Sequence, residues 1–195
     1  MATKYYAVKK GIKTGIFMTW DECRQYVEGF SGAQYKSFTS RKEAEEFLEE
    51  KKFEVQENTP YAFVDGSYNP VAGVYGYGGF LVAEGKKYIL SGSGSDEEMS
   101  SMRNVAGEVL GSMAAIERAI ELGLDSLTVY YDYMGIEMWA TGAWKRNKSG
   151  TIAYHDYVQS VKDVIKLTFV KVKAHSNIDG NEEADRLAKA AVGIE

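Results

Sequence analysis

The order of hydrophobic patterns in residues 61–191 restricts the fold of this chain more than any other feature. Residues 61–92 contain three strand-like segments separated by glycine-rich turns, which predicts an antiparallel meander. Residues 102–122 then carry apolar side chains at spacings of three and four, the pattern of an amphipathic helix. Later segments alternate between strands, at 127–132 and 167–172, and helices, at 135–140, 154–164 and 181–191. This order predicts an α/β fold, a mixed five-stranded sheet flanked by helices on both faces.

Charge divides the chain into two parts. Residues 1–42 carry eight basic and three acidic side chains, a net charge of +5, whereas residues 43–60 are rich in glutamate. Residues 61–195 hold 13 basic and 18 acidic side chains, which equals the whole net charge of −5. Such an asymmetry predicts a basic module joined to a different one. We expect a small domain at 1–48, a short linker at 49–60 and a larger domain at 61–195.

The first domain has the pattern of a small α/β unit. Two strand-like segments, a helix, a third strand-like segment and a second helix follow one another within 48 residues. Thr19 and Glu22 have the spacing of a capping box, which predicts that the first helix begins directly after Thr19. Trp20, Cys23 and Val27 lie on one face of that helix, which allows Trp20 to be read as part of the core.

Composition excludes several classes of protein. With 45% hydrophobic residues and only two prolines, the chain is expected to be globular. The single cysteine, Cys23, excludes an intramolecular disulfide and favours a reducing compartment. The chain has no run of eighteen apolar residues, so we expect a cytoplasmic protein without membrane association. A uniformly spread charge of −5 would disfavour nucleic acid as a partner, but the basic segment at 1–42 removes that objection.

Four carboxylates lie where the predicted elements would place them among apolar side chains. These are Asp65 at the end of the first strand of the larger domain, Glu108 on helix 102–122, Asp132 at the end of strand 127–132, and Asp185 on the last helix. A buried carboxylate is costly unless it is paired or bound to a metal, and several hard oxygen ligands suit Mg²⁺. Taken singly, each has a structural explanation; Asp65-Gly66-Ser67, for example, is commonest as a turn. Taken together, they indicate a site for two divalent ions that acts on a phosphodiester.

The motifs around these carboxylates resemble ribonuclease H of type I over about residues 61–193. The resemblance is carried by Asp65-Gly-Ser67, Arg103-Asn-Val-Ala-Gly-Glu108, Tyr131-Asp132-Tyr133, and His175-Ser176 with Asn181-Glu-Glu-Ala-Asp185-Arg-Leu-Ala. It implies a ribonuclease H-like fold and an endoribonuclease that hydrolyses the RNA strand of RNA/DNA hybrids, leaving 5′-phosphate and 3′-hydroxyl ends. It also implies two Mg²⁺ ions, with Mn²⁺ as an alternative.

The resemblance also assigns roles to single residues. Asp65 would bridge both ions, Asp185 would complete the site of the ion that activates water, and Glu108 and Asp132 would hold the other ion. His175 would act as a proton shuttle or help the product to leave, since its ordinary pKa lies near neutrality. Asn104 would hydrogen-bond a 2′-hydroxyl of the hybrid.

Residues 4–48 resemble the hybrid-binding domain found at the front of many such enzymes. The similarity rests on Tyr5-Tyr6-Ala-Val8, Thr19-Trp20-Asp-Glu-Cys23 and Tyr35-Lys36-Ser-Phe38. It implies that Trp20 and Tyr35 pack against deoxyriboses of the DNA strand and that Tyr6 and Lys36 contact its phosphates. Some relatives have a second lysine where this chain has Ser37, so one phosphate contact is expected to be missing.

Trp144 and Lys145 belong to a short basic segment, Trp144-Lys-Arg-Asn-Lys148, which could bind the DNA backbone or could be a solvated loop. Some relatives have a longer basic protrusion at this place. Because the segment is short in this chain, we expect its larger domain to depend more on residues 1–48 for binding the hybrid. Two other functions stay open at this point: a catalytically silent scaffold that binds hybrids, and another nuclease or strand-transfer enzyme with this fold. No obligate protein partner is indicated.

Overall fold

A computed structural model describes residues 4–48, 59–172 and 179–194 of this chain. The chain divides into two compact units, residues 1–54 and residues 55–195, which are treated separately below. Among the helices that the structure describes, none is long and apolar enough to cross a membrane. The predicted linker at 49–60 falls mostly outside the described residues, so its bounds stay a prediction.

The first unit is built around a three-stranded antiparallel sheet in the order β2-β1-β3. Its elements are β1 (Tyr5–Lys10), β2 (Gly15–Phe17), α1 (Trp20–Val27), β3 (Gln34–Phe38) and α2 (Arg41–Leu48). The Thr19 hydroxyl accepts a hydrogen bond from the Glu22 N–H at 3.3 Å, which confirms Thr19 as the cap of α1. Cys23 and Val27 are buried against Val8 of the sheet, so this face of α1 forms the core.

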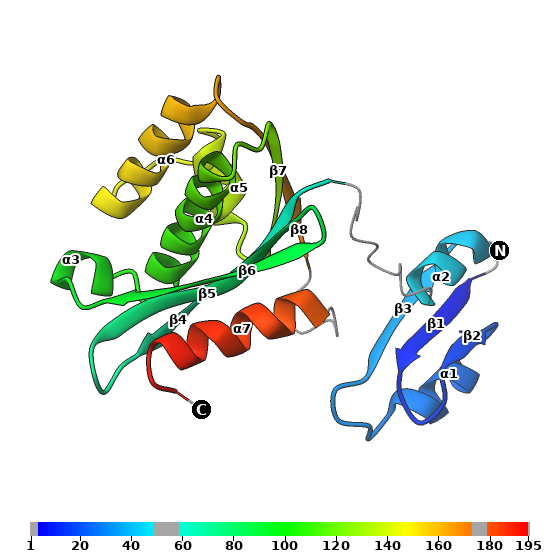
Figure 1. Ribbon diagram of the computed structural model, residues 1–195. Coiled ribbons are helices and arrows are strands. Elements are labelled where there is room, and N and C mark those ends of the chain that lie inside the picture. The colour runs from blue at the N-terminus through cyan, green and yellow to red at the C-terminus, as the bar shows by residue number, and fades with distance from the viewer. Residues whose placement is uncertain (1–3, 49–58, 173–178, 195) are drawn as a thin grey trace. The chain divides into compact units, whose positions relative to one another are not determined.

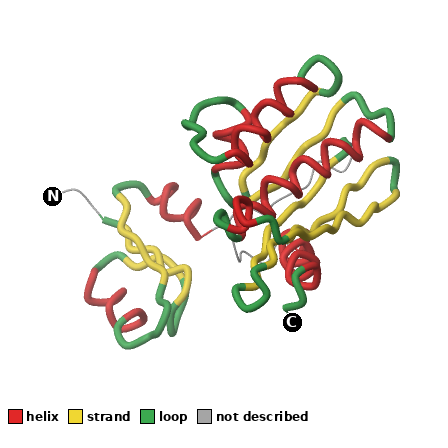
Figure 2. The backbone as a smooth tube through the Cα atoms, turned by 90° about the vertical axis from the view of Figure 1, so that its left-hand side faces the viewer, coloured by secondary structure: helices red, strands yellow, loops and turns green. Residues whose placement is uncertain are grey.

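The second unit contains a five-stranded mixed sheet in the order β6-β5-β4-β7-β8 (Figures 1 and 2). Its strands are β4 (Tyr61–Asn69), β5 (Val74–Ala83), β6 (Lys86–Gly94), β7 (Ser126–Tyr131) and β8 (Lys166–Lys171). The first three pair antiparallel as a meander, while β4, β7 and β8 run parallel to one another. The fold class expected from the sequence is therefore confirmed.

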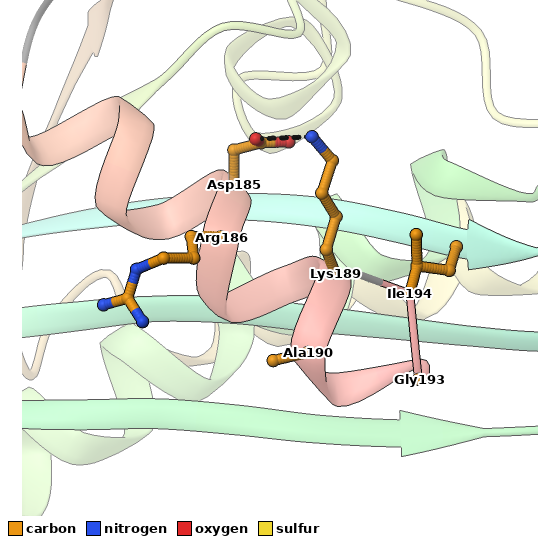
Figure 3. A pocket seen from close by; sticks show the side chains of 6 residues that line it. All are labelled: Asp185, Arg186, Lys189, Ala190, Gly193 and Ile194. Atoms are coloured by element: carbon orange, nitrogen blue, oxygen red, sulfur yellow. Dashed lines mark hydrogen bonds and ion pairs between the residues drawn. The ribbon is translucent and has the colours of Figure 1, made fainter.

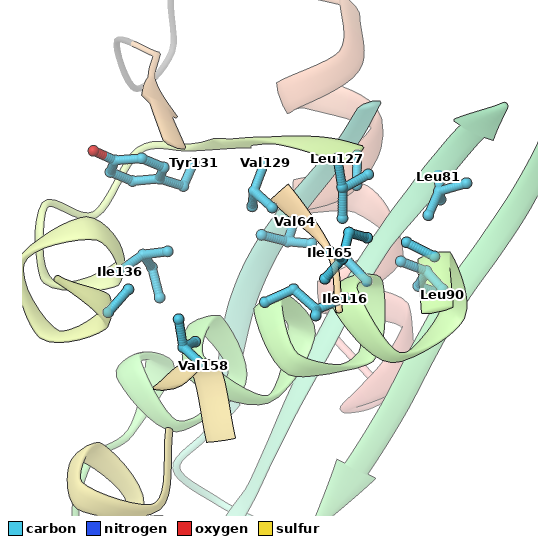
Figure 4. Packing of buried hydrophobic residues seen from close by; sticks show 14 of the residues in the cluster. Val64, Leu81, Leu90, Ile116, Leu127, Val129, Tyr131, Ile136, Val158 and Ile165 are labelled. Carbon is cyan, nitrogen blue, oxygen red and sulfur yellow. The ribbon is translucent and has the colours of Figure 1, made fainter. Parts of the chain in front are cut away.

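Helices cover both faces of this sheet. They are α3 (Glu97–Ser100), α4 (Asn104–Glu121), α5 (Gly135–Ala140), α6 (Ser149–Val161) and α7 (Asp179–Ala191). Figure 1 shows α4, α5 and α6 on one side of the sheet and α7 on the other. The main core fills the space between α4 and the sheet, where Val64, Ile116 and Leu127 pack together (Figure 4). Within this core the hydroxyls of Ser112 and Tyr154 form a buried hydrogen bond of 3.0 Å.

The helices α6 and α3 differ most from the expected pattern. The helix expected at 154–164 spans Ser149–Val161 instead, and Gly150 in its first turn packs closely against the sulfur atoms of Met99 and Met102. A Cβ atom at Gly150 would lie 2.6 Å from the Met99 sulfur. The short helix α3, which supplies Met99, was not predicted, since four residues carry too little periodicity.

The reading of Asp65-Gly66-Ser67 as a turn is wrong. Strand β4 continues through these residues to Asn69, and Gly66 pairs with Tyr77 of β5. The glycine is required because α4 crosses the strand at this point: a Cβ atom at Gly66 would lie 2.2 Å from the Asn104 carbonyl oxygen and 2.4 Å from the Glu108 nitrogen. Gly66 therefore serves the close approach of a helix and a strand rather than a reversal of the chain.

Candidate active site

Asp65 and Asp132 are brought together by the register of two parallel strands. Phe63 of β4 is paired with Tyr130 of β7, and continuing each strand by two residues reaches Asp65 and Asp132. Asp132 directly follows the last residue of β7. The two carboxylates therefore lie side by side where the parallel pairing ends, the edge at which open α/β sheets commonly hold ligands.

Glu108 joins them from α4. It lies in the second turn of the helix and is only 5% exposed. The helix can approach β4 because two glycines remove the side chains that would separate them: Gly66 on the strand and Gly107 on the helix, where a Cβ would lie 1.9 Å from the Gly76 carbonyl oxygen. As a result, oxygen atoms of Asp65, Glu108 and Asp132 lie within 4.8 Å of one another.

Burial and mutual repulsion make Asp65 and Glu108 unusually basic. The pKa of Asp65 is raised from 3.8 to about 6, chiefly by burial and also by the charges of Asp132 and Asp185, while hydrogen bonds with Glu108 and the Gly66 N–H act in the opposite direction. Burial also raises the pKa of Glu108 well above its ordinary value, and the charges of Asp65 and Asp132 act in the same direction. Without cations, the site therefore holds protons that a solvated cluster would release.

The residues present fit a divalent metal ion. Glu108 is buried, yet its Oε2 atom has no hydrogen-bond partner among the described residues. An orphaned carboxylate oxygen beside two further carboxylates offers the hard ligands that Mg²⁺ or Mn²⁺ binds. A bound cation would also offset the repulsion that raises the pKa of Asp65 and of Glu108.

Asp185 approaches the cluster from α7 on the other face of the sheet. Its charge contributes to the raised pKa of Asp65, so it lies close enough to interact with the cluster. Its own Oδ2 atom accepts a hydrogen bond from the Lys189 ammonium at 2.7 Å. This hydrogen bond is also a salt bridge, so a lysine already neutralises part of the Asp185 charge.

Three of the aromatic and basic residues expected to bind nucleic acid lie together in the first unit. Trp20 is 40% exposed and lies between Tyr6 and the 46% exposed Tyr35, with ring centroids 5.9 Å and 5.7 Å away. This exposure favours the reading of Trp20 as a binding residue over its reading as core. Lys36 follows Tyr35 in β3 and so points to the opposite face, where its ammonium lies 5.4 Å from the Phe38 ring.

Trp144 and Lys145 are exposed and lie beyond the end of α5. The Trp144 ring packs edge-on against the Trp139 ring, with 6.0 Å between the ring centroids. The Trp139 indole N–H donates a hydrogen bond of 3.3 Å to the Lys145 carbonyl. The Trp139 ring in turn packs against the ring of Tyr133, the residue after Asp132, with 5.7 Å between the ring centroids. A row of aromatic rings thus leads from the carboxylate cluster to the basic segment.

Comparison with known proteins matches each of the two units to a family model. A family model described as RNase H matches residues 57–193, and one described as the Ribonuclease H1 N-terminal domain matches residues 4–48. This chain belongs to the ribonuclease H family. Ribonuclease H1 of Homo sapiens is 28% identical over 252 residues, covering 95% of this chain and 88% of the relative. Ribonuclease H of Schizosaccharomyces pombe is 25% identical over 259 residues, covering 95% and 96%.

Solved structures show the same fold for the larger unit. RNase H1 from Halobacterium salinarum has a TM-score of 0.55 at 24% identity, covering 69% of this chain and 98% of that one. LC11-RNase H1, solved in complex with an RNA/DNA hybrid, has a TM-score of 0.53 at 17% identity, covering 69% and 99%. The family and the enzyme class expected from the sequence, a ribonuclease H, are thereby confirmed.

The remaining residues expected in this ribonuclease H site lie in different situations. His175 lies outside the described residues, so its role stays a prediction. Asn104 is the exposed first residue of α4, with its carbonyl oxygen against Gly66. Two residues near the site were missed. Tyr133 lies close enough to Glu108 for the charge of Glu108 to add to the burial that raises the pKa of Tyr133, and Trp139 connects Tyr133 to Trp144. Tyr133 could have been suggested by its position directly after Asp132, whereas no sequence signal indicates Trp139.

Proposed function

We propose that this ribonuclease H hydrolyses the RNA strand of RNA/DNA hybrids as an endonuclease with two divalent metal ions, preferably Mg²⁺. The observation that carries the proposal is the group of the buried Asp65 and Glu108 with the partly buried Asp132, whose oxygen atoms lie within 4.8 Å of one another. Holding three carboxylates this close together, two of them buried, is unfavourable for folding alone. Membership of the ribonuclease H family supports the hybrid as substrate.

The roles of the residues follow from their positions. Bound divalent ions would activate a water molecule and stabilise the charge on the leaving 3′-oxygen, so that the products carry 5′-phosphate and 3′-hydroxyl ends. Asp65, which interacts with each of the other three carboxylates, is suited to bridge two ions. Asp185 would complete one ion site, and Glu108 with Asp132 the other. His175 would carry a proton to or from the reacting groups.

We further propose that residues 1–48 bind the hybrid and that residues 61–195 cleave it, with 49–60 as a linker. The exposed rings of Trp20 and Tyr35 would pack against sugars of the DNA strand, since aromatic faces bind strands without reading their sequence. Tyr6 and Lys36 would contact its phosphates. In the larger unit, Asn104 would contact a 2′-hydroxyl, which distinguishes RNA from DNA, and Trp144 and Lys145 would contact the DNA backbone.

The direct test is cleavage of a labelled RNA/DNA hybrid with Mg²⁺ by the full chain, by Asp65→Asn and by Asp156→Asn. Asp156 is an exposed residue of α6 and serves as a matched control. We expect cleavage by the wild type and the control, loss of cleavage in Asp65→Asn, and products with 5′-phosphates that a ligase accepts. Binding without cleavage by the wild type would indicate a silent scaffold, and equal cutting of duplex DNA would indicate a different nuclease.

A further inference from the structure

Lys189 forms an ion pair with Asp185 within α7. The Nζ atom lies 2.7 Å from Oδ2, and both side chains are partly exposed, at 43% and 37%. Figure 3 shows the two side chains pointing toward each other along one side of the helix, while Arg186 points away from them. All three residues line a cavity of about 600 Å³ that also includes Ile194. The contact is therefore open to solvent and to small ions.

The position of Lys189 is fixed by tight packing of α7 on the sheet. A Cβ atom at Gly78 of β5 would lie 2.0 Å from the Ala188 nitrogen, so strand and helix backbones nearly touch at the residue before Lys189. The Asn69 side chain donates a hydrogen bond of 2.9 Å to the Val192 carbonyl at the end of the helix. Because the helix is packed tightly on the sheet, the ion pair opens by rotation of the Lys189 or Asp185 side chain rather than by a shift of the helix.

The two halves of the carboxylate group thus differ before any metal binds. On the α4 side, Glu108 has a buried oxygen without a hydrogen-bond partner among the described residues. On the α7 side, Asp185 already holds a cation. The charge of Lys189 also reaches the cluster, because the hydrogen bond with Asp185, the charge of Asp185 and, to a lesser extent, the charge of Asp65 raise the pKa of Lys189.

We propose that Lys189 is a built-in counter-ion of Asp185, which a divalent ion bound between Asp65 and Asp185 must displace. The site then fills in order: a first ion binds at Asp65, Glu108 and Asp132, and a second ion binds more weakly because it competes with the ammonium group. Lys189 is a positioning residue in this scheme. The inference rests on the two-ion site proposed above and adds what makes its two halves unequal.

The test measures Mn²⁺ binding to the full chain without nucleic acid, from the electron paramagnetic resonance signal of free Mn²⁺. We expect two classes of site in the wild type. Lys189→Met should tighten the weaker class by roughly three- to tenfold, the range for loss of one competing charge in a partly exposed pair. Lys189→Arg keeps the charge and should restore the wild-type value. Arg186→Met removes a charge from the same cavity without touching Asp185 and should change the affinity by less than about twofold.

Four outcomes would overturn the inference. The weaker class of Mn²⁺ site could keep its affinity in Lys189→Met, which would mean that the lysine does not compete with the metal. Its affinity could also fall, which would mean that the lysine holds Asp185 in place for the metal. Arg186→Met could raise the Mn²⁺ affinity as strongly as Lys189→Met, which would mean that any positive charge in the cavity has this effect and that the ion pair with Asp185 is not its cause. Finally, a wild type that neither binds Mn²⁺ nor cleaves the hybrid would refute the proposed function itself. Circular dichroism of each variant checks that the fold is kept.

Discussion

Replacing Asp65 with asparagine should stabilise the metal-free protein at neutral pH. The pKa of Asp65 is raised from 3.8 to about 6 in the folded protein, chiefly by burial. At about 1.4 kcal/mol for each pKa unit, full ionisation of this group costs the folded state about 3 kcal/mol. Because the folded pKa is the higher one, the folded state binds the proton more tightly, and the contribution of Asp65 to the free energy of unfolding is greatest below pH 4. It falls as the pH rises through 6. Asparagine carries no charge and avoids this loss.

The expected difference can be worked out for two accessible pH values. Between pH 4.5 and 7.5 the titration of Asp65 should cost the wild type about 2 kcal/mol that Asp65→Asn does not lose. The raised pKa of Glu108 adds to the decline in both proteins. At pH 7.5 in EDTA the variant should therefore be more stable by about 1–2 kcal/mol, after about 1 kcal/mol is subtracted for the weaker hydrogen bonds of an amide.

Urea unfolding followed by tryptophan fluorescence measures this difference. A Trp20→Phe background leaves only Trp139 and Trp144, so that the signal reports on the larger unit of the full chain. Asp156→Asn should keep the wild-type pH dependence, and Mg²⁺ at pH 7.5 should stabilise the wild type more than Asp65→Asn by mass action. Parallel pH curves for wild type and Asp65→Asn, or a less stable variant at pH 7.5 in EDTA, would refute the electrostatic reasoning.

Three further predictions concern packing and binding. Gly78→Ala should lower the free energy of unfolding by about 3 kcal/mol, since its Cβ would lie 2.0 Å from the Ala188 nitrogen; an unchanged urea midpoint would contradict the close contact of α7 and β5. Ser112→Ala should cost about 1–3 kcal/mol in the same assay, because the fully buried Tyr154 hydroxyl loses its partner. Trp20→Ala should weaken binding of a fluorescent hybrid by about 5- to 100-fold in anisotropy titrations, if packing on a sugar contributes as much as stacking on a base, whereas the variant with the exposed Met18 changed to alanine should bind as the wild type does.

The sequence predicts most of the site because periodicity locates Glu108, Asp132 and Asp185 on their elements. The predicted turn after Asp65 is wrong, since an Asp-Gly pair is compatible both with a tight turn and with a strand that a helix crosses closely. Only the position of α4 distinguishes the two cases. The ion pair of Asp185 and Lys189 has a readable signal, the i,i+4 spacing on a helix, whereas the contact of Tyr133 with Trp139 depends on how a short helix packs and has none.

Most of the net negative charge equals the charge of the four carboxylates at the proposed metal site. Asp65, Glu108, Asp132 and Asp185 contribute −4 of the total of −5 when ionised. Two divalent ions at the proposed site would offset all four, which leaves a protein close to neutral with an excess of positive charge in residues 1–42. A phosphate backbone would then meet the basic unit and the cation-filled site rather than a repulsive surface. Metal binding would therefore prepare the larger unit to receive the hybrid as well as to cleave it, so hybrid affinity should rise with divalent ions even in a variant that cannot hydrolyse.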